Sequence, residues 1–132
     1  VLAEFSTAVH FADMMRRLQE MIRLGYHPVI AHAERYQCLH QSEERLAQIQ
    51  KTGSRIQLNA GSILGRSGPQ IRRFCIRALQ EGLADFIASD AHSMDGRPVE
   101  LAACMKKVQR KFGKNKADWW FGLAQEKLFG DF

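Results

Sequence analysis

Acidic and imidazole side chains follow short apolar runs at two places in the sequence. Residues 86–88 form one apolar run, and Asp90 and His92 come shortly after it. Residues 28–31 form a second run, which ends at His32 and is followed by Glu34 and Arg35. A carboxylate and an imidazole that leave a buried strand together can point into one pocket, where they bind a metal ion or exchange a proton. The repeated pattern therefore predicts a metal site or an acid–base site.

Two arginines lie close to these candidate ligands in the sequence. Arg35 follows His32, and Arg97 follows His92 after a short turn-like stretch. Planar guanidinium groups make paired hydrogen bonds to phosphate oxygens and stabilise the charge that redistributes during phosphoryl transfer. Spacing alone is equally consistent with two exposed arginines, so both interpretations stay open at this point.

The elements that must position these residues alternate between two patterns. Strand-like runs cover residues 1–5, 28–31, 55–58 and 85–88, and each is followed by apolar residues at helical spacing. Four strand–helix units in succession predict an α/β fold with about four parallel strands. Because four strands are too few for an eight-stranded barrel, we expect a partial barrel or an open sheet.

Local start and stop signals predict several helix boundaries. Ser6 or Thr7 is expected to cap the first helix, and Ser42 the second, by accepting free backbone N–H groups. Near the end of the chain, residues 114–116 are expected to form a basic hinge. A final helix is predicted over residues 117–128.

In parallel α/β sheets the functional site forms at the carboxyl ends of the strands. Those ends would carry Glu4, His32, Asn59 and Asp90, with His92 just beyond. Taken singly, Glu4 could be a surface acid, His32 a loop histidine and Asp90 a helix cap. Their shared position at one end of successive strands favours a common site for Mn, Zn or Fe. The predicted metal ligands are therefore Glu4, His32, Asp90 and His92.

Composition and charge narrow the class of protein. The 132 residues are 45% hydrophobic, which suits a globular domain, and no apolar run approaches the length of about 20 residues that a membrane span needs. The net charge is +5, but the basic residues are spread through predicted helices, as in Arg16–Arg17 and Lys106–Lys107. Solvated helix faces have this pattern, so neither membrane insertion nor nucleic-acid binding is expected.

Cysteine usage predicts a cytoplasmic location. Cys38, Cys75 and Cys104 are odd in number and lack metal-type spacing, which suggests reduced thiols. Cys104 and Arg110 match the spacing of the cysteine phosphatases. They fall on a predicted helix, however, where the backbone N–H groups are already used and cannot cradle a phosphate.

Three segments together resemble the bacterial capsule and exopolysaccharide tyrosine phosphatases of the polymerase and histidinol phosphatase (PHP) superfamily. The segments are 31–36 (AHAERY), 57–65 (QLNAGSILG) and 88–92 (ASDAH), the last continuing to Arg97. The resemblance implies a distorted (β/α) barrel of PHP type, of which residues 1–132 would be the C-terminal portion, with the N-terminal half absent. A start at Val1, without Met and inside a strand-like run, agrees with this expectation.

The same resemblance implies a function. It implies that metal-activated water hydrolyses phosphotyrosine on a tyrosine kinase that controls capsule or exopolysaccharide synthesis. The expected cofactor is Mn²⁺, with Fe, Co or Zn as other options. By motif, the metal ligands would be Glu4, His32, Asp90 and His92, and the phosphate-binding residues Arg35 and Arg97. Because part of the site would be missing, the isolated chain could be inactive.

Two alternatives remain open on the sequence. One is another metal-dependent phosphoesterase of PHP type, built on the same strand-end ligands. The other is a non-catalytic binding domain whose positive charge holds an acidic partner.

Overall fold

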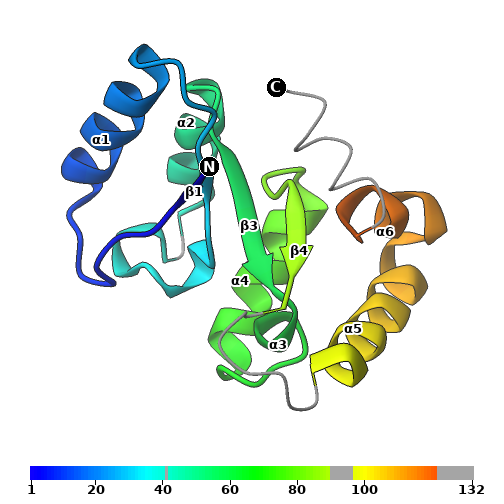
Figure 1. Cartoon of the computed structure of the whole chain (residues 1–132). Helices are drawn as coiled ribbons and strands as arrows, with labels where there is room; N and C mark the ends of the chain where they lie inside the picture. The colour runs from blue at the N-terminus through cyan, green and yellow to red at the C-terminus, as the bar shows by residue number, and fades with distance from the viewer. Residues whose placement is uncertain (41, 90–96, 122–132) are drawn as a thin grey trace.

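The sheet positions the candidate site. The computed structural model describes residues 1–40, 42–89 and 97–121, with only the backbone described over 97–99 (Figure 1). The sheet is parallel, and the strands follow one another in sequence order. They are β1 (Leu2–Ala3), β2 (Val29–Ile30), β3 (Arg55–Asn59) and β4 (Phe86–Ala88). The predicted α/β fold with four parallel strands is confirmed.

The register brings the ends of the strands to one edge. Ala3 pairs with Ile30, and Asn59 pairs with Ala88, so β1 ends beside β2 and β3 ends beside β4. Ile30 pairs with Ile56, so β3 continues three residues beyond the end of β2. The short β1–β2 ladder is closed by the N–H of Ala31, which donates to the carbonyl of Ala3 over 3.2 Å. Residues that follow the four strands therefore start from the same side of the sheet.

Helices connect and cover the strands. The α-helices are α1 (Phe11–Arg23), α2 (Glu43–Lys51), α3 (Ala60–Ile63), α4 (Pro69–Gln80), α5 (Arg97–Phe112) and α6 (Lys114–Phe121). Two 3₁₀ turns, η1 (Ala33–Arg35) and η2 (Gln37–Leu39), follow β2. In Figure 1, α1 lies on one side of the sheet and the α5–α6 pair on the other, beside β4. Within the described ranges, no helix combines the length and apolarity that crossing a membrane requires.

Of the predicted helix boundaries, one is confirmed and two are wrong. The Ser42 hydroxyl accepts the N–H of Arg45 over 3.3 Å, as a cap should. The first helix begins only at Phe11, because Ser6 is engaged in a local turn that ends at Val9. There is also no hinge over 114–116, since the chain turns one residue earlier, at Gly113 with φ +93°. The predicted final helix is described as far as Phe121.

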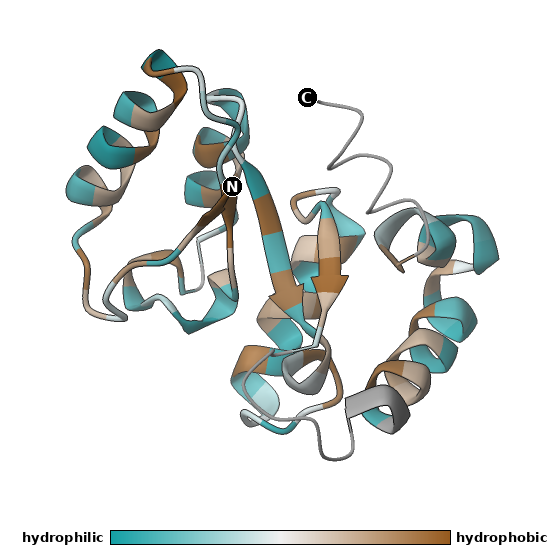
Figure 2. Cartoon of the chain, viewed as in Figure 1, coloured by the Kyte–Doolittle hydropathy of each residue, from teal (hydrophilic) through white to brown (hydrophobic). Residues whose placement is uncertain are grey.

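The core lies between the strands and the inner faces of the helices. Ile30, Ile56 and Leu58 of the sheet are completely buried. The helices pack apolar residues onto this layer and turn their polar faces outward (Figure 2). At the far end, the indole N–H of Trp120 donates to the carbonyl of Ala84 over 3.2 Å and so fixes α6 beside β4. The edge of the sheet that carries the candidate site is therefore supported by a packed apolar core.

We expect Leu58→Ala to lower the free energy of unfolding by about 2–5 kcal/mol, because it opens a cavity beneath the end of β3. Leu24→Ala serves as the matched control, since Leu24 is 66% exposed and should change stability by less than about 0.5 kcal/mol. Urea unfolding followed by circular dichroism measures both values. Equal effects of the two substitutions would contradict the assignment of Leu58 to the core.

Candidate metal and phosphate site

Two of the predicted ligands meet at the carboxyl end of the sheet. Glu4 follows β1, and His32 lies just past β2. Nε2 of His32 is 3.9 Å from Oε1 of Glu4. The His32 side chain is 16% exposed and that of Glu4 is 60% exposed, so the carboxylate faces solvent and the imidazole lies beneath it. The pair is thus a partly covered site with one carboxyl and one imidazole donor.

His32 adopts a strained backbone conformation. With φ 39° and ψ 55°, it is the one non-glycine residue with positive φ in the described part of the chain. This left-handed conformation costs a β-carbon residue about 1–2 kcal/mol. The turn that follows supports it, because the N–H of Arg35 donates to the carbonyl of His32 over 3.0 Å. Strain of this kind is typical of functional sites, and here it determines the direction of the backbone at His32, a predicted ligand.

The donor atoms of this pair fit a divalent transition metal. Nδ1 of His32 is buried and has no hydrogen-bond partner among the described residues, so the ring is not engaged as an ordinary core histidine. Imidazole and carboxylate together suit Mn, Fe or Zn. Two ligand bonds of about 2.1 Å each can span the 3.9 Å between Nε2 and Oε1. The pair can therefore contribute two ligands to one cation.

The remaining predicted residues are placed only in part. Asp90 and His92 lie outside the described residues. Arg97 is described as the first backbone residue of α5, and Arg35 is exposed at the end of η1. Within the described ranges, no group of three or more His, Cys, Asp or Glu side chains is placed to hold a metal. The described geometry therefore supplies two candidate ligands and one candidate phosphate-binding arginine.

Tyr36 joins the segment after Glu4 to the loop after His32. Its hydroxyl accepts the backbone N–H of Phe5 over 3.0 Å, and its ring lies 5.5 Å from the His32 ring, centroid to centroid. The side chain is completely buried, and this burial raises the pKa of the Tyr36 phenol. Tyr36 is therefore a neutral wall of the site that holds the two ligand-bearing segments side by side.

Glu34 is the buried acid that anchors the loop. It has no exposed surface, its Oε2 accepts the Ser62 hydroxyl over 2.5 Å, and its Oε1 accepts the backbone N–H of Asn59 over 3.3 Å. Burial raises the pKa of the Glu34 carboxyl above its usual range. In addition, its backbone carbonyl lies 2.9 Å from Nε2 of His40. Glu34 thus ties the loop that carries His32 and Arg35 to the junction of β3 and α3.

Sequence reasoning noted Glu34 beside His32, but it predicted no supporting role for Glu34, Tyr36 or Ser62. Glu34, Tyr36 and Ser62 are all buried, and they contact the predicted site residues or the segments that bear them. A signal was present, because Glu34 lies between His32 and Arg35, and Ser62 follows Asn59 closely at the next strand end. Only the fold shows that these two polar segments face each other.

A further ion pair fixes the start of α5. Nε of Arg66 lies 2.6 Å from Oε1 of Glu100, in the first turns of the helix that begins at Arg97. Gly61 makes room for this contact, since a β-carbon there would approach Oε1 of Glu100 to 2.8 Å. The α3 segment, which also bears Ser62, therefore holds both the Glu34 loop and the start of α5.

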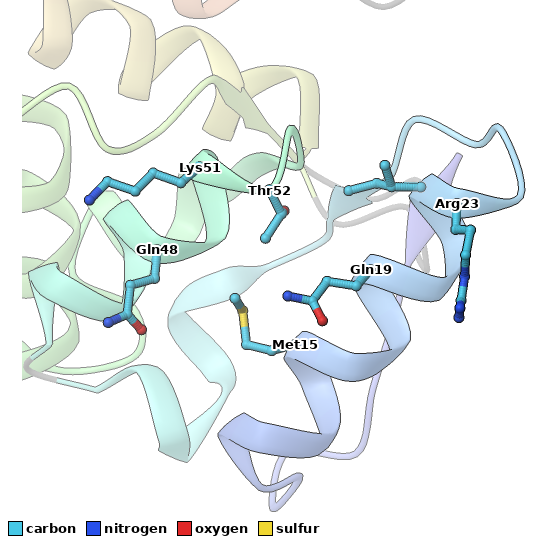
Figure 3. Close-up of a pocket in the computed structure, with 7 residues that line it drawn as sticks. Met15, Gln19, Arg23, Gln48, Lys51 and Thr52 are labelled. Carbon is cyan, nitrogen blue, oxygen red and sulfur yellow. The ribbon is translucent and has the colours of Figure 1, made fainter.

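A separate hollow of about 510 Å³ lies between α1 and α2 (Figure 3). Its described lining includes Met15, Gln19, Lys51 and Thr52, and no carboxylate or imidazole is among these described residues. Lys51 and Thr52 precede β3, so this part of the hollow lies near the amino ends of the strands. It is not part of the candidate site.

Comparison with known proteins places the chain among proteins of capsule synthesis. The family profile described as "Capsular polysaccharide synthesis, CpsB/CapC" matches residues 1–129. "Tyrosine-protein phosphatase CpsB" of Streptococcus agalactiae serotype V is 38% identical over 125 residues, which cover 91% of this chain and 51% of the relative. "Tyrosine-protein phosphatase YwqE" of Bacillus subtilis is 33% identical over 89 residues, covering 67% and 35%. The chain spans about half the length of the CpsB relative.

A solved structure shares the fold. It belongs to a study of YwqE from Bacillus subtilis and CpsB from Streptococcus pneumoniae, described as unique metal-dependent tyrosine phosphatases. The TM-score is 0.75 at 27% identity, and the match covers 86% of this chain and 46% of that chain. The expected PHP-type α/β architecture is thereby supported by structure as well as by sequence.

We expect Glu34→Ala to lower the free energy of unfolding by about 2–4 kcal/mol, because it leaves the Asn59 N–H and the Ser62 hydroxyl buried without their partner. In Glu34→Gln, the amide oxygen can still accept the Asn59 N–H, and the amide N–H can donate to the Ser62 hydroxyl oxygen. The loss of stability at neutral pH should therefore be smaller. Urea unfolding of both variants, with Ser62→Ala as a matched single-bond control, measures the difference. Equal losses for Ala and Gln would contradict the hydrogen-bonded role.

The pH dependence of this difference has a defined sign. The pKa of Glu34 is raised in the folded state, so the unfolded chain releases this proton first as pH increases. The contribution of Glu34 to stability is therefore greatest below its unfolded pKa of about 4.3 and falls as pH rises toward the folded value. Glu34→Gln has no such group and should gain on the wild type across that interval. Parallel pH profiles for the two proteins would contradict the raised pKa.

Proposed function

The chain belongs to the CpsB/CapC family of capsular polysaccharide synthesis, and on that premise we propose that it is part of a metal-dependent protein-tyrosine phosphatase. The observation that carries the proposal is the Glu4–His32 pair, 3.9 Å apart at the carboxyl edge of the sheet, with Arg35 on the turn that follows. We further propose that residues 1–132 form the C-terminal portion of a single PHP-type domain. Coverage of about half of the CpsB relative supports this assignment.

The proposed metal ligands are Glu4 and His32 together with Asp90 and His92, and the proposed metal is Mn²⁺, with Fe, Co and Zn as alternatives. A divalent metal held by these residues would supply Lewis-acid charge and would lower the pKa of a bound water. Glu4 and His32 hold one side of the site from β1 and β2. The strained turn at His32 and the wall formed by Tyr36 keep this side fixed before any ligand binds.

The proposed role of Arg35 and Arg97 is to bind the phosphate of the substrate. Arg35 is exposed and directly follows the buried anchor Glu34, so the base of its side chain is fixed while the guanidinium reaches solvent. A guanidinium group beside a phosphoryl oxygen stabilises the charge of the transition state. The fixed backbone reduces the ordering that such a contact requires.

A cysteine nucleophile does not fit this chain. Cys104 is completely buried on α5, whereas Arg110 of the same helix is exposed. Burial raises the pKa of Cys104 to about 12, so its thiol is protonated at neutral pH. Cys75 is buried as well, and its pKa is raised further. The matching Cys–Arg spacing in the sequence is therefore coincidental, which supports the metal-dependent route.

The proposed substrate is a protein that carries phosphotyrosine, and specifically a tyrosine kinase that controls capsule or exopolysaccharide synthesis. The names of the relatives support a phosphotyrosine substrate, and the description of the family supports the link to capsule synthesis. We also propose a cytoplasmic location. The three cysteines are free in the structure, which fits a reducing compartment.

We expect the protein that carries this chain to release phosphate from a phosphotyrosine peptide in Mn²⁺, and to lose this activity in EDTA. His32→Ala removes a ligand and should lower kcat/KM by at least about 10²-fold. Arg35→Ala removes a charge-stabilising donor and should lower it by about 10²- to 10³-fold. Malachite-green detection of phosphate measures these rates.

Cys104→Ala is the control, and it should retain activity within about threefold, since the thiol is buried away from the site. Metal content by elemental analysis supplies a second readout and should fall in His32→Ala. Full activity of His32→Ala would overturn the assignment of the site. Preference for a small phosphomonoester such as histidinol phosphate would favour another PHP-type phosphoesterase. If the wild type bound no metal and hydrolysed no substrate, a binding domain would be favoured.

A further inference from the structure

The positive charge of this chain is concentrated in two helices. Helices α4 and α5 hold eight of the 19 Lys and Arg residues and one of the 14 Asp and Glu residues. The rest of the chain therefore carries 11 basic and 13 acidic residues, so the net charge of +5 arises entirely from these helices. Their single acid, Glu100, is paired with Arg66 from outside the two helices.

The fold gathers part of this charge around one groove, which we call the α4–α5 groove. It has a volume of about 280 Å³ and is lined by Arg72, Arg73, Ile76, Arg77, Gln80 and Lys111. All four basic residues are exposed, and no acid is among the described residues that line the groove. Arg77 is paired with Glu43 over 2.8 Å, but Arg72, Arg73 and Lys111 make no ion pair with the other described residues. Within the described part of the chain, the groove thus presents three basic side chains without an ion-pair partner.

The α4–α5 groove starts at the end of the molecule that bears the candidate site. Helix α4 follows β3 and α3, so its first turns, with Arg72 and Arg73, lie toward the carboxyl edge of the sheet. Helix α5 begins at the same end with Arg97, and Figure 1 shows both helices running from there away from the arrowheads of the strands. A chain bound with one residue at the site can therefore continue into the groove.

We propose that the α4–α5 groove binds acidic residues that flank the phosphotyrosine of the substrate protein. This inference rests on the proposed function, because that function supplies a peptide at the neighbouring site. Guanidinium and ammonium groups match carboxylates in charge and hydrogen bonding. Concentrated charge of one sign also increases the rate of encounter with a partner of the other sign. The groove then selects among phosphotyrosines by their sequence context.

The lining favours a peptide over a nucleic acid. Single-stranded nucleic acids are held by aromatic side chains on which the bases stack, and the described residues that line the α4–α5 groove include none. Ile76 and Gln80 instead offer an apolar contact and an amide beside the cations. Such a mixture suits the side chains and backbone of an extended acidic peptide.

The test measures binding without catalysis. A fluorescent peptide with an unphosphorylated tyrosine flanked by glutamates is compared, by anisotropy, with the same peptide flanked by glutamines. The groove variant is Arg72→Gln/Arg73→Gln, and the matched control is Arg23→Gln/Lys51→Gln, an exposed pair on α1 and α2 with the same charge loss, away from the candidate site. We expect the groove variant to weaken binding of the glutamate peptide by roughly five- to tenfold, the control by less than about twofold, and added salt to reduce the difference.

Several results would overturn the docking proposal. These are equal weakening by both double variants, equal affinity for the two peptides, or no measurable affinity for either. Tighter groove-dependent binding of a single-stranded oligonucleotide of equal charge would assign the groove to nucleic acid instead.

A small aryl phosphate separates this inference from the proposed function. It does not extend into the α4–α5 groove, so Arg72→Gln/Arg73→Gln should leave its hydrolysis unchanged while raising KM for a glutamate-flanked phosphotyrosine peptide. If the wild type fails to hydrolyse it but binds the acidic peptide through the groove, the phosphatase proposal fails and the docking surface stands. If hydrolysis occurs and peptide context has no effect on KM, the docking proposal fails alone.

Discussion

The hydrogen bonds of the buried Glu34 carboxylate hold the candidate site together. They join the loop after β2 to the junction of β3 and α3, two segments that the parallel sheet brings to the same edge. An unpaired carboxylate at this depth would be strongly destabilising, so its two protein donors are a requirement of the fold. The conformation of His32 depends on this loop, and the backbone that carries Arg35 is placed by it. A site whose backbone is fixed in this way does not have to be ordered by its ligand.

The sequence predicted the elements of this arrangement better than their contacts. Strand ends could be predicted because short apolar runs and strictly alternating strand–helix units leave few topologies open. The common edge of Glu4 and His32 followed from topology, and the structure places their side chains 3.9 Å apart. The helix start near Ser6 failed because a serine can serve a turn as well as a cap, and a local pattern does not distinguish the two. The bonds between Glu34, Asn59 and Ser62 join residues 25 and 28 positions apart, which no local pattern encodes.

The distribution of positive charge over the surface also could not be predicted from the sequence alone. In the sequence, the basic residues of α4 and α5 are separate doublets that look like solvated faces, and most doublets in helical proteins are such faces. Only the fold places Arg72, Arg73 and Lys111 around one groove, with no acid among the described residues of its lining. The composition gives the net charge of the chain, whereas its concentration on one pair of helices depends on which elements become neighbours.

The strained turn at His32 suggests how the fold prepares the site for a metal. A left-handed histidine and a buried Nδ1 without a partner both raise the free energy of the folded chain in the absence of a ligand. The turn through Arg35, the Tyr36 hydroxyl and the Glu34 bonds offset that cost. A cation held by Nε2 of His32 and Oε1 of Glu4 would leave both features as they are, so it would bind with little rearrangement of this side of the site. Glu4, which is mostly exposed and has no such support, would be the donor that adjusts to the size of the metal.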